Sequence, residues 1–153
     1  MNADLIAVLF SWAVTLSGMH ADLPPLVEAR PHAFFVAQAC AGHECKVYGW
    51  YAHERTVYFD DRLDPNDTLA SSIIIHEMVH YLQHEKQRLD PALQGVAYSE
   101  DVIDCNAAIA LEMEAYGVQR EFLQRYGVYR PVGQSMLQVG CAPAPADAAT
   151  AAR

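Results

Sequence analysis

The stretch from Leu69 to Leu89 constrains the fold of this chain more than any other segment. It contains neither glycine nor proline. The turn-forming run Asp64-Pro-Asn-Asp67 precedes it, and Asp90-Pro91 follows it. Aspartate is a favoured helix cap, and proline does not continue a helix. The sequence therefore predicts one long core helix here, against which the remaining elements must pack.

Two histidines inside this helix are placed to share a metal ion. His76 and His80 are four positions apart, so they differ by only about 40° around the helix and both imidazoles point the same way. Glu77 is rotated by roughly 100° from His76, which places its carboxylate beside the metal, where a bound water would sit. The alternative is that both histidines are core residues and Glu77 faces solvent. The uncharged flanks Ile73–Ile75 and Tyr81-Leu82 favour a buried metal site.

This HExxH pattern predicts a site for one Zn²⁺ ion, with His76 and His80 as ligands and Glu77 as the catalytic general base. Catalytic zinc sites keep three protein ligands and one open position. Zinc lowers the pKa of its water to about 7, and Glu77 can take the proton and return it to a leaving amine. The predicted reaction is hydrolysis of a peptide bond, with a peptide or protein as substrate.

The third ligand must come from another segment, because no histidine follows at the metzincin spacing. A second long helix is predicted from about Glu100 to Tyr126. Its acidic residues are Asp101, Asp104, Glu112, Glu114 and Glu121. At about 100° per residue, Glu112 falls near the middle of the apolar face and Glu114 on the polar face. A buried carboxylate is costly unless it is paired or bound to metal, so Glu112 is predicted as the third ligand and Glu114 as a solvated acid.

Four further residues keep more than one interpretation. His84 continues the i, i+4 series but is expected to lie partly exposed beyond the site. Gln119 shares the buried face of the second helix and is either a hydrogen-bonding partner of the site or a core amide. Tyr98 and Tyr116 are candidate donors to a developing oxyanion, although such tyrosines are more often core or rim residues.

The rest of the chain predicts an α+β fold. Apolar residues at helical spacing predict a buried N-terminal helix: Leu5, Val8, Leu9, Trp12 and Leu16. A secretory signal is disfavoured because no basic residue precedes this run, and the run is too short to span a bilayer.

Residues 32–39 (HAFFVAQA) are predicted as a strand. Lys46–Ala52 and Thr56–Asp60 are predicted as an antiparallel hairpin, which forms most of a small sheet.

Length and net charge limit the number of domains and the kinds of binding partner. With 153 residues the chain suffices for one domain, predicted over residues 1–141, and residues 142–153 (APAPADAATAAR) are predicted as a disordered tail. The net charge of -9 would repel phosphate backbones, so nucleic acid is not an expected partner.

The four cysteines permit two disulfides in an oxidising compartment. Cys40 and Cys45 could close a short loop, which would leave Cys105 to pair with Cys141. The alternative is four reduced thiols. The even count favours an extracytoplasmic location, periplasmic or secreted, although no clear signal peptide is present.

The motif residues resemble the gluzincin branch of the zincin metallopeptidases, in which an HExxH helix is followed by a helix that supplies a glutamate ligand. His76, Glu77 and His80 match the motif, and Glu112 within Glu112-Met-Glu-Ala-Tyr116 matches the ligand glutamate. Most of residues 5–126 also resemble a small bacterial HExxH family of unknown function.

This resemblance implies a minimal zincin-like domain in which the strand Thr56–Asp60 is the edge strand that lines the cleft and receives an extended peptide. Tyr116 stands where the family usually carries an acid, so the hydrogen bond made by that acid is not expected here. The alternative function is a non-enzymatic zinc-binding module, structural or partner-binding, with a degenerate peptidase fold.

Overall fold

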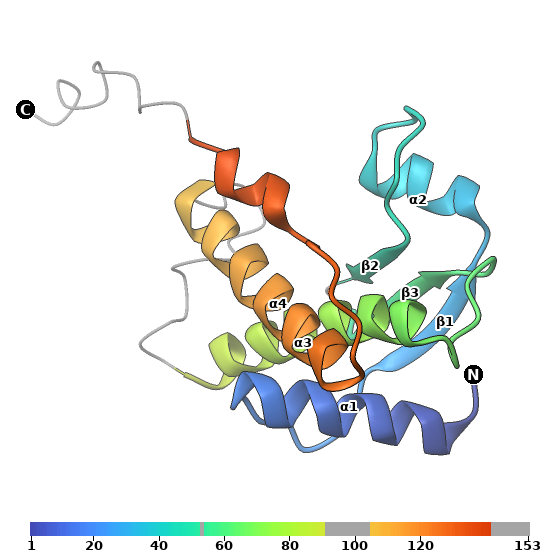
Figure 1. Cartoon of the computed structure of the whole chain (residues 1–153), viewed down its shortest axis with the longest axis vertical. Coiled ribbons are helices and arrows are strands. Elements are labelled where there is room, and N and C mark those ends of the chain that lie inside the picture. The colour runs from blue at the N-terminus through green and yellow to red at the C-terminus, as the bar shows by residue number, and fades with distance from the viewer. Residues whose placement is uncertain (53, 91–104, 142–153) are drawn as a thin grey trace, which may run out of the picture.

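The computed structural model describes residues 1–52, 54–90 and 105–141. Its helices are α1 (Ala3–Ser17), α2 (His32–Ala39), α3 (Thr68–Leu89), α4 (Cys105–Arg125) and the short 3₁₀ helix η1 (Gln134–Gln138), and its strands are β1 (Leu26–Arg30), β2 (Gly49–Ala52) and β3 (Thr56–Asp60). The fold class is α+β, as the sequence predicts. Figure 1 shows α3 passing between α1, α4 and the sheet.

Helix α3 forms where the capping signal and the apolar run coincide. The side chain of Asp67 accepts hydrogen bonds from the backbone N–H groups of Leu69 (2.9 Å) and Ala70 (3.2 Å). The helix contacts α1, α4, β2 and β3, and Ile74, Ile75 and other apolar residues on several of its faces are fully buried. A helix that is apolar on most sides belongs in the interior of a domain. The polar residues of the HExxH motif in α3 therefore face neighbouring elements of the domain.

The sheet has three strands in the order β1-β3-β2. β2 pairs antiparallel with β3, from Gly49 opposite Phe59 to Ala52 opposite Thr56, which confirms the predicted hairpin. β3 also pairs with β1 in parallel, so the sheet is mixed rather than antiparallel throughout. The prediction that Thr56–Asp60 is an edge strand is wrong, because β3 has a partner on each side. The edge strand next to α3 is β2.

The sequence does not predict β1, and it predicts α2 wrongly as a strand. β1 carries charged residues and is largely exposed, so it lacks the alternation that identifies a half-buried strand. Residues His32–Ala39 are helical, and Pro31 occupies the N-cap position with φ at -65°. Short apolar runs cannot be assigned to helix or strand by periodicity alone. The parallel pairing of β1 with β3 requires a crossover connection, and α2 lies within it.

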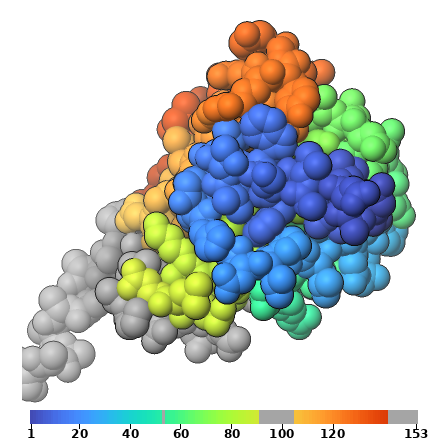
Figure 2. All heavy atoms as spheres, turned by 90° about the horizontal axis from the view of Figure 1, so that it is seen from below, coloured from blue at the N-terminus to red at the C-terminus, as the bar shows by residue number. Residues whose placement is uncertain are grey.

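Helix α1 packs against both α3 and α4. Leu9 and Ala13 are buried, and the ring of Trp12 meets Phe122 of α4 edge-on at 5.7 Å between centroids. Figure 2 shows α1, in dark to mid blue, across the middle of the lower face of the molecule. The predicted helix is confirmed, but one predicted core residue is wrong, because Val8 is 52% exposed.

Both predicted disulfides are present. Cys40–Cys45 closes the turn after α2, and Cys105–Cys141 ties the first residue of α4 to the segment after η1. Within the described ranges, no helix is both long and apolar enough to cross a membrane. The predicted tail at 142–153 and the predicted helical residues 100–104 lie outside the described residues.

The central position of α3 can be tested with two leucines of the same helix. Leu82 is fully buried and Leu89 is 60% exposed. We expect Leu82→Ala to lower the free energy of unfolding by about 2–5 kcal/mol, because it leaves a cavity in the core. Leu89→Ala should change that free energy by less than about 0.5 kcal/mol. Urea unfolding followed by circular dichroism under non-reducing conditions measures both, and equal effects would contradict the burial of this helix.

Candidate metal centre

Helices α3 and α4 bring the three predicted metal ligands together. Nε2 of His80 lies 3.1 Å from Nε2 of His76. The carboxylate of Glu112 lies 3.4 Å from His76 Nε2 through Oε2 and 3.3 Å from His80 Nε2 through Oε1. One ligand atom of each residue lies within 4.8 Å of the other two, so the group could hold a metal ion.

The electrostatics of this cluster favour a positive charge between the three side chains. Burial opposes the charged form of His80, but its hydrogen bond with Glu112 and the nearby Glu77 carboxylate raise its pKa to about 9. Burial likewise acts to raise the pKa of Glu112, yet hydrogen bonds with His76 and His80 bring it well below its usual value. The Glu112 side chain is 39% exposed, and a proton on His80 or a bound cation would each neutralise this partly buried carboxylate, so a cation could take the place of the proton.

Glu77 lies beside the cluster with its carboxylate toward β2. A Cβ atom at Gly49 would lie 2.7 Å from Glu77 Oε1, so only glycine lets the edge strand come this close. Burial raises the pKa of Glu77, while the charges of His76 and His80 and the hydrogen bond from the Tyr51 backbone N–H partly offset that rise. Glu77 is therefore close to both histidines without being part of the ligand group.

Gln83 connects α3 and α4, the two helices that carry the candidate ligands. Its Oε1 lies 2.9 Å from His80 Nδ1, and its Nε2 donates to the backbone carbonyl of Leu111 at 3.0 Å and to Glu114 at 2.9 Å. The two acceptors on α4 require the amide nitrogen, so the amide oxygen must face His80. That oxygen only accepts, so in neutral His80 the imidazole proton lies on Nδ1 and the Nε2 lone pair is left for a metal.

Gln83 is not predicted as a site residue, because an amide side chain carries no acid, base or typical metal-ligand chemistry. The sequence signal that could have identified Gln83 is its spacing from His80. Gln83 follows His80 by three residues, which places both side chains on the same face of α3.

The other residues singled out in the sequence have structural partners. Glu114 is exposed, as predicted, but it also accepts the hydrogen bond from Gln83. Gln119 donates to Ser72 Oγ at 3.1 Å, which makes it a core amide between α3 and α4. His84 Nδ1 lies 2.8 Å from the Tyr51 hydroxyl, and His84 is half-buried and outside the ligand group.

Tyr116 packs directly on His76, one of the predicted ligands. Its ring centroid lies 4.4 Å from that of His76, and burial raises its pKa. The buried Nδ1 atom of His76 has no hydrogen-bonding partner among the described residues. The role of Tyr116 as an oxyanion donor stays a prediction. Tyr98, Asp101 and Asp104 lie outside the described residues.

A cavity of about 450 Å³ opens next to the cluster. His76 and Glu77 line it from α3, and Tyr116 and Gln119 line it from α4. Ligand sites in proteins typically measure roughly 300–1,000 Å³. A ligand in this cavity would lie against one predicted metal ligand and the predicted general base.

We compared the chain with protein-family models, with curated proteins and with solved structures, and none of them matches it. The resemblance to gluzincins therefore stays a prediction.

Gln83→Ala should weaken zinc binding about 10–100-fold, the usual effect of removing a group that orients a metal-bound histidine. The matched control is Gln119→Ala, which removes a second buried amide that bridges the same two helices through Ser72. We expect the control to leave zinc affinity unchanged. Competition with a chromogenic zinc chelator measures both affinities, and equal losses would contradict a specific role for Gln83.

Metal binding should also release a proton. His80 is protonated at neutral pH in the metal-free protein, because its pKa is about 9, and a metal binds only the neutral imidazole. We expect the association constant for zinc to rise about tenfold per pH unit from pH 7 toward pH 9 and then to level off. The same chelator competition, repeated across this pH range, checks the slope. A constant affinity would contradict the raised pKa.

Proposed function

We propose that this protein is a zinc-dependent peptidase in which His76, His80 and Glu112 bind the metal and Glu77 acts as the general base. The observation that carries the proposal is the convergence of two imidazoles and one carboxylate, with a further carboxylate beside them that is not a ligand. Two histidines and a glutamate form one of the ligand sets of catalytic zinc sites.

The spacing of the ligand atoms supports zinc as the metal. In a tetrahedral site with metal–ligand distances of roughly 2.0–2.1 Å, neighbouring ligand atoms lie roughly 3.3 Å apart. In the cluster the two imidazole Nε2 atoms lie 3.1 Å apart, and Glu112 meets them through different oxygens, Oε2 at 3.4 Å from His76 and Oε1 at 3.3 Å from His80. Three protein ligands leave the fourth position open, which distinguishes catalytic zinc sites from structural ones.

The chain's own residues supply the acid–base chemistry. When bound, zinc would polarise the carbonyl of a substrate and lower the pKa of a bound water to about 7. Glu77, held by the Tyr51 N–H on one side of the cavity, takes the proton of the attacking water. The raised pKa of Glu77 strengthens it as a base, and in its protonated form it returns the proton to the leaving amine.

The arrangement agrees with the gluzincin resemblance in its ligand set and differs in the strand that would receive a substrate. A peptide can join a sheet as a further strand only at an edge strand, which has a partner on one side only. β3 has none, whereas β2 is an edge strand whose residue Gly49 lines the cavity. We therefore propose that an extended peptide pairs with β2, in place of the strand Thr56–Asp60 expected from the resemblance.

Glu77→Gln should keep zinc bound and lower kcat for peptide hydrolysis by about 10²–10⁴-fold, because the amide cannot accept the proton. Metal content by elemental analysis and cleavage of a mixed peptide library, read by mass spectrometry, measure the two effects. Unchanged hydrolysis would refute Glu77 as the base.

Two glutamates on α4 give the matched control. Glu112→Ala should lose bound zinc, and Glu114→Ala should keep it. Loss of zinc only in the Glu114 variant would refute the ligand assignment. Zinc binding by the wild-type protein without hydrolysis of any peptide would instead support the alternative, a zinc-binding module without catalysis.

A further inference from the structure

We propose that His32 is a positioning residue for Glu77, acting through the segment 45–48 and strand β2. The inference rests on the proposed peptidase function and adds to it a residue outside the HExxH motif. His32 lies on α2, outside the ligand group and outside the lining of the cavity. Three successive contacts connect it to the general base.

The first contact is between Glu77 and the backbone of β2. A Cβ atom at Gly49 would lie 2.7 Å from Oε1 and 2.8 Å from Cγ of Glu77, so the Glu77 side chain packs directly on this strand. The backbone N–H of Tyr51 also donates a hydrogen bond to Glu77. β2 is only four residues long, and among the described strands it pairs only with β3. The place of this short strand therefore decides how the carboxylate of Glu77 is oriented.

The second contact holds the segment that leads into β2. Residues 44–48 belong to no helix or strand. The backbone carbonyl of Tyr48 accepts from the N–H of Asp60 at 2.9 Å, and the carbonyl of Cys45 lies 3.2 Å from Nε2 of His32. The ring of His32 also lies 5.7 Å from that of Tyr48. His32 therefore fixes the segment at a second point, three residues before Tyr48.

The third contact fixes His32 itself. Its Nδ1 lies 2.7 Å from Oδ2 of Asp60, the fully buried last residue of β3. Arg62 donates to both carboxylate oxygens of Asp60, and these hydrogen bonds lower the pKa of that carboxyl to about 2. An ionised carboxylate only accepts hydrogen bonds, so the imidazole donates from Nδ1. Nε2 faces the Cys45 carbonyl and, at 3.3 Å, Glu44 Oε1, so a proton on each ring nitrogen satisfies all of these partners.

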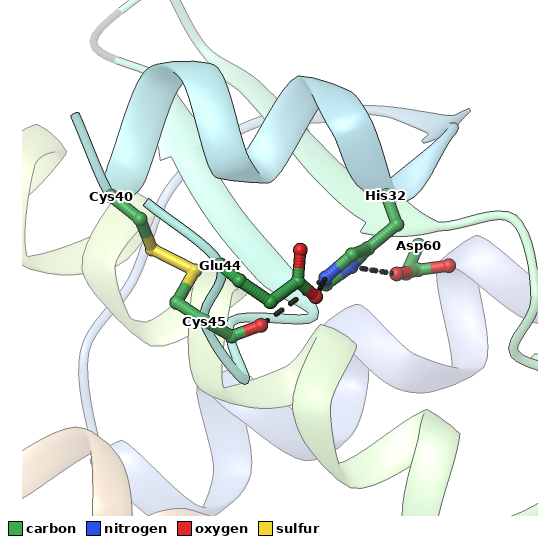
Figure 3. Close-up of a disulfide and its surroundings, with 5 residues drawn as sticks. All are labelled: His32, Cys40, Glu44, Cys45 and Asp60. Atoms are coloured by element: carbon green, nitrogen blue, oxygen red, sulfur yellow. Dashed lines mark hydrogen bonds and ion pairs between the residues drawn. A yellow bond between two sulfur atoms is a disulfide. The ribbon is translucent and has the colours of Figure 1, made fainter. Parts of the chain in front are cut away.

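The Cys40–Cys45 disulfide does not replace these contacts. It joins two residues five positions apart, so it closes the turn after α2 without tying that turn to the sheet. Figure 3 shows the ring of His32 between Asp60 and the turn that carries the disulfide. Loss of this link should let the segment 45–48 and the start of β2 move relative to Glu77.

The test replaces His32 by phenylalanine, which keeps a ring beside Tyr48 and removes both hydrogen bonds. The matched control is His43→Phe, because His43 is an exposed histidine within the turn that the disulfide closes. Hydrogen exchange of backbone amides, followed by NMR on the purified full-length protein, needs no substrate. In His32→Phe the Tyr51 amide should exchange at least about tenfold faster, the effect of losing one hydrogen bond to a charged group. In the control its rate should not change.

The amides of Ile75 and Leu82 separate positioning from a general loss of stability. Both residues are fully buried in α3, so their exchange reports opening of the whole core. His32→Phe should accelerate the Tyr51 amide more than either of them. Zinc affinity, measured by chelator competition, should stay the same, because the candidate ligands lie on α3 and α4.

Peptide hydrolysis gives a second readout. His32→Phe should lower kcat about 10–100-fold, because a misplaced base reacts poorly. In the Glu77→Gln background the same substitution should lower the residual kcat no further, because the base that His32 positions is already absent. His43→Phe should leave kcat unchanged in both backgrounds.

The outcomes distinguish this inference from the proposed function. Selective acceleration at Tyr51, with no peptide hydrolysis by the wild-type protein, supports positioning by His32 and refutes the peptidase. Hydrolysis by the wild-type protein, with Tyr51 exchange and kcat unchanged in His32→Phe, supports the peptidase and overturns the inference. Equal acceleration of all three amides, or a further fall of kcat in the double variant, also overturns it, because His32 would then stabilise the domain as a whole.

Discussion

The contact between α3 and α4 is the constraint on which the candidate site depends, because neither helix carries all three candidate ligands. Apolar side chains of α4 are buried from Ala115 onward, whereas its residues before Glu112 are half-buried or exposed. Hydrophobic packing therefore sets the distance between the two helices in the part of α4 that follows Glu112. At the site itself, the helices meet through polar groups, with the carboxylate of Glu112 against two imidazoles.

Two buried amides give this contact its register. Gln83 reaches from α3 to the backbone of α4, and Gln119 reaches from α4 to Ser72 on α3. A buried amide that loses its partner costs about 1–3 kcal/mol, so sliding one helix past the other would be penalised at both places. Apolar packing alone tolerates such shifts more readily. The register in turn decides which acidic residue of α4 faces the histidines.

The sequence predicts the long elements well and the short ones poorly. α3 and α4 have many turns of consistent periodicity, and the hairpin has aromatic and β-branched runs around a polar turn. α2 has only two turns of apolar residues, a pattern that fits a buried strand equally well. β1 is exposed along most of its length, so its sequence lacks the alternation of apolar and polar residues that identifies a half-buried strand. Gln83 has no distinctive chemistry of its own, and only its partners show its role.

By itself, the sequence determines that His76, Glu77 and His80 lie on one helix with both imidazoles on the same side, because helix geometry is local and repeats every 3.6 residues. The helical wheel also favours Glu112, since a carboxylate on an apolar face needs a cation. Only the tertiary structure decides that β2 rather than β3 is the edge strand near Glu77, and that Val47 and Val132 line one cavity. These relations join segments far apart in the chain, and they follow from the packing of whole elements, which no local pattern encodes.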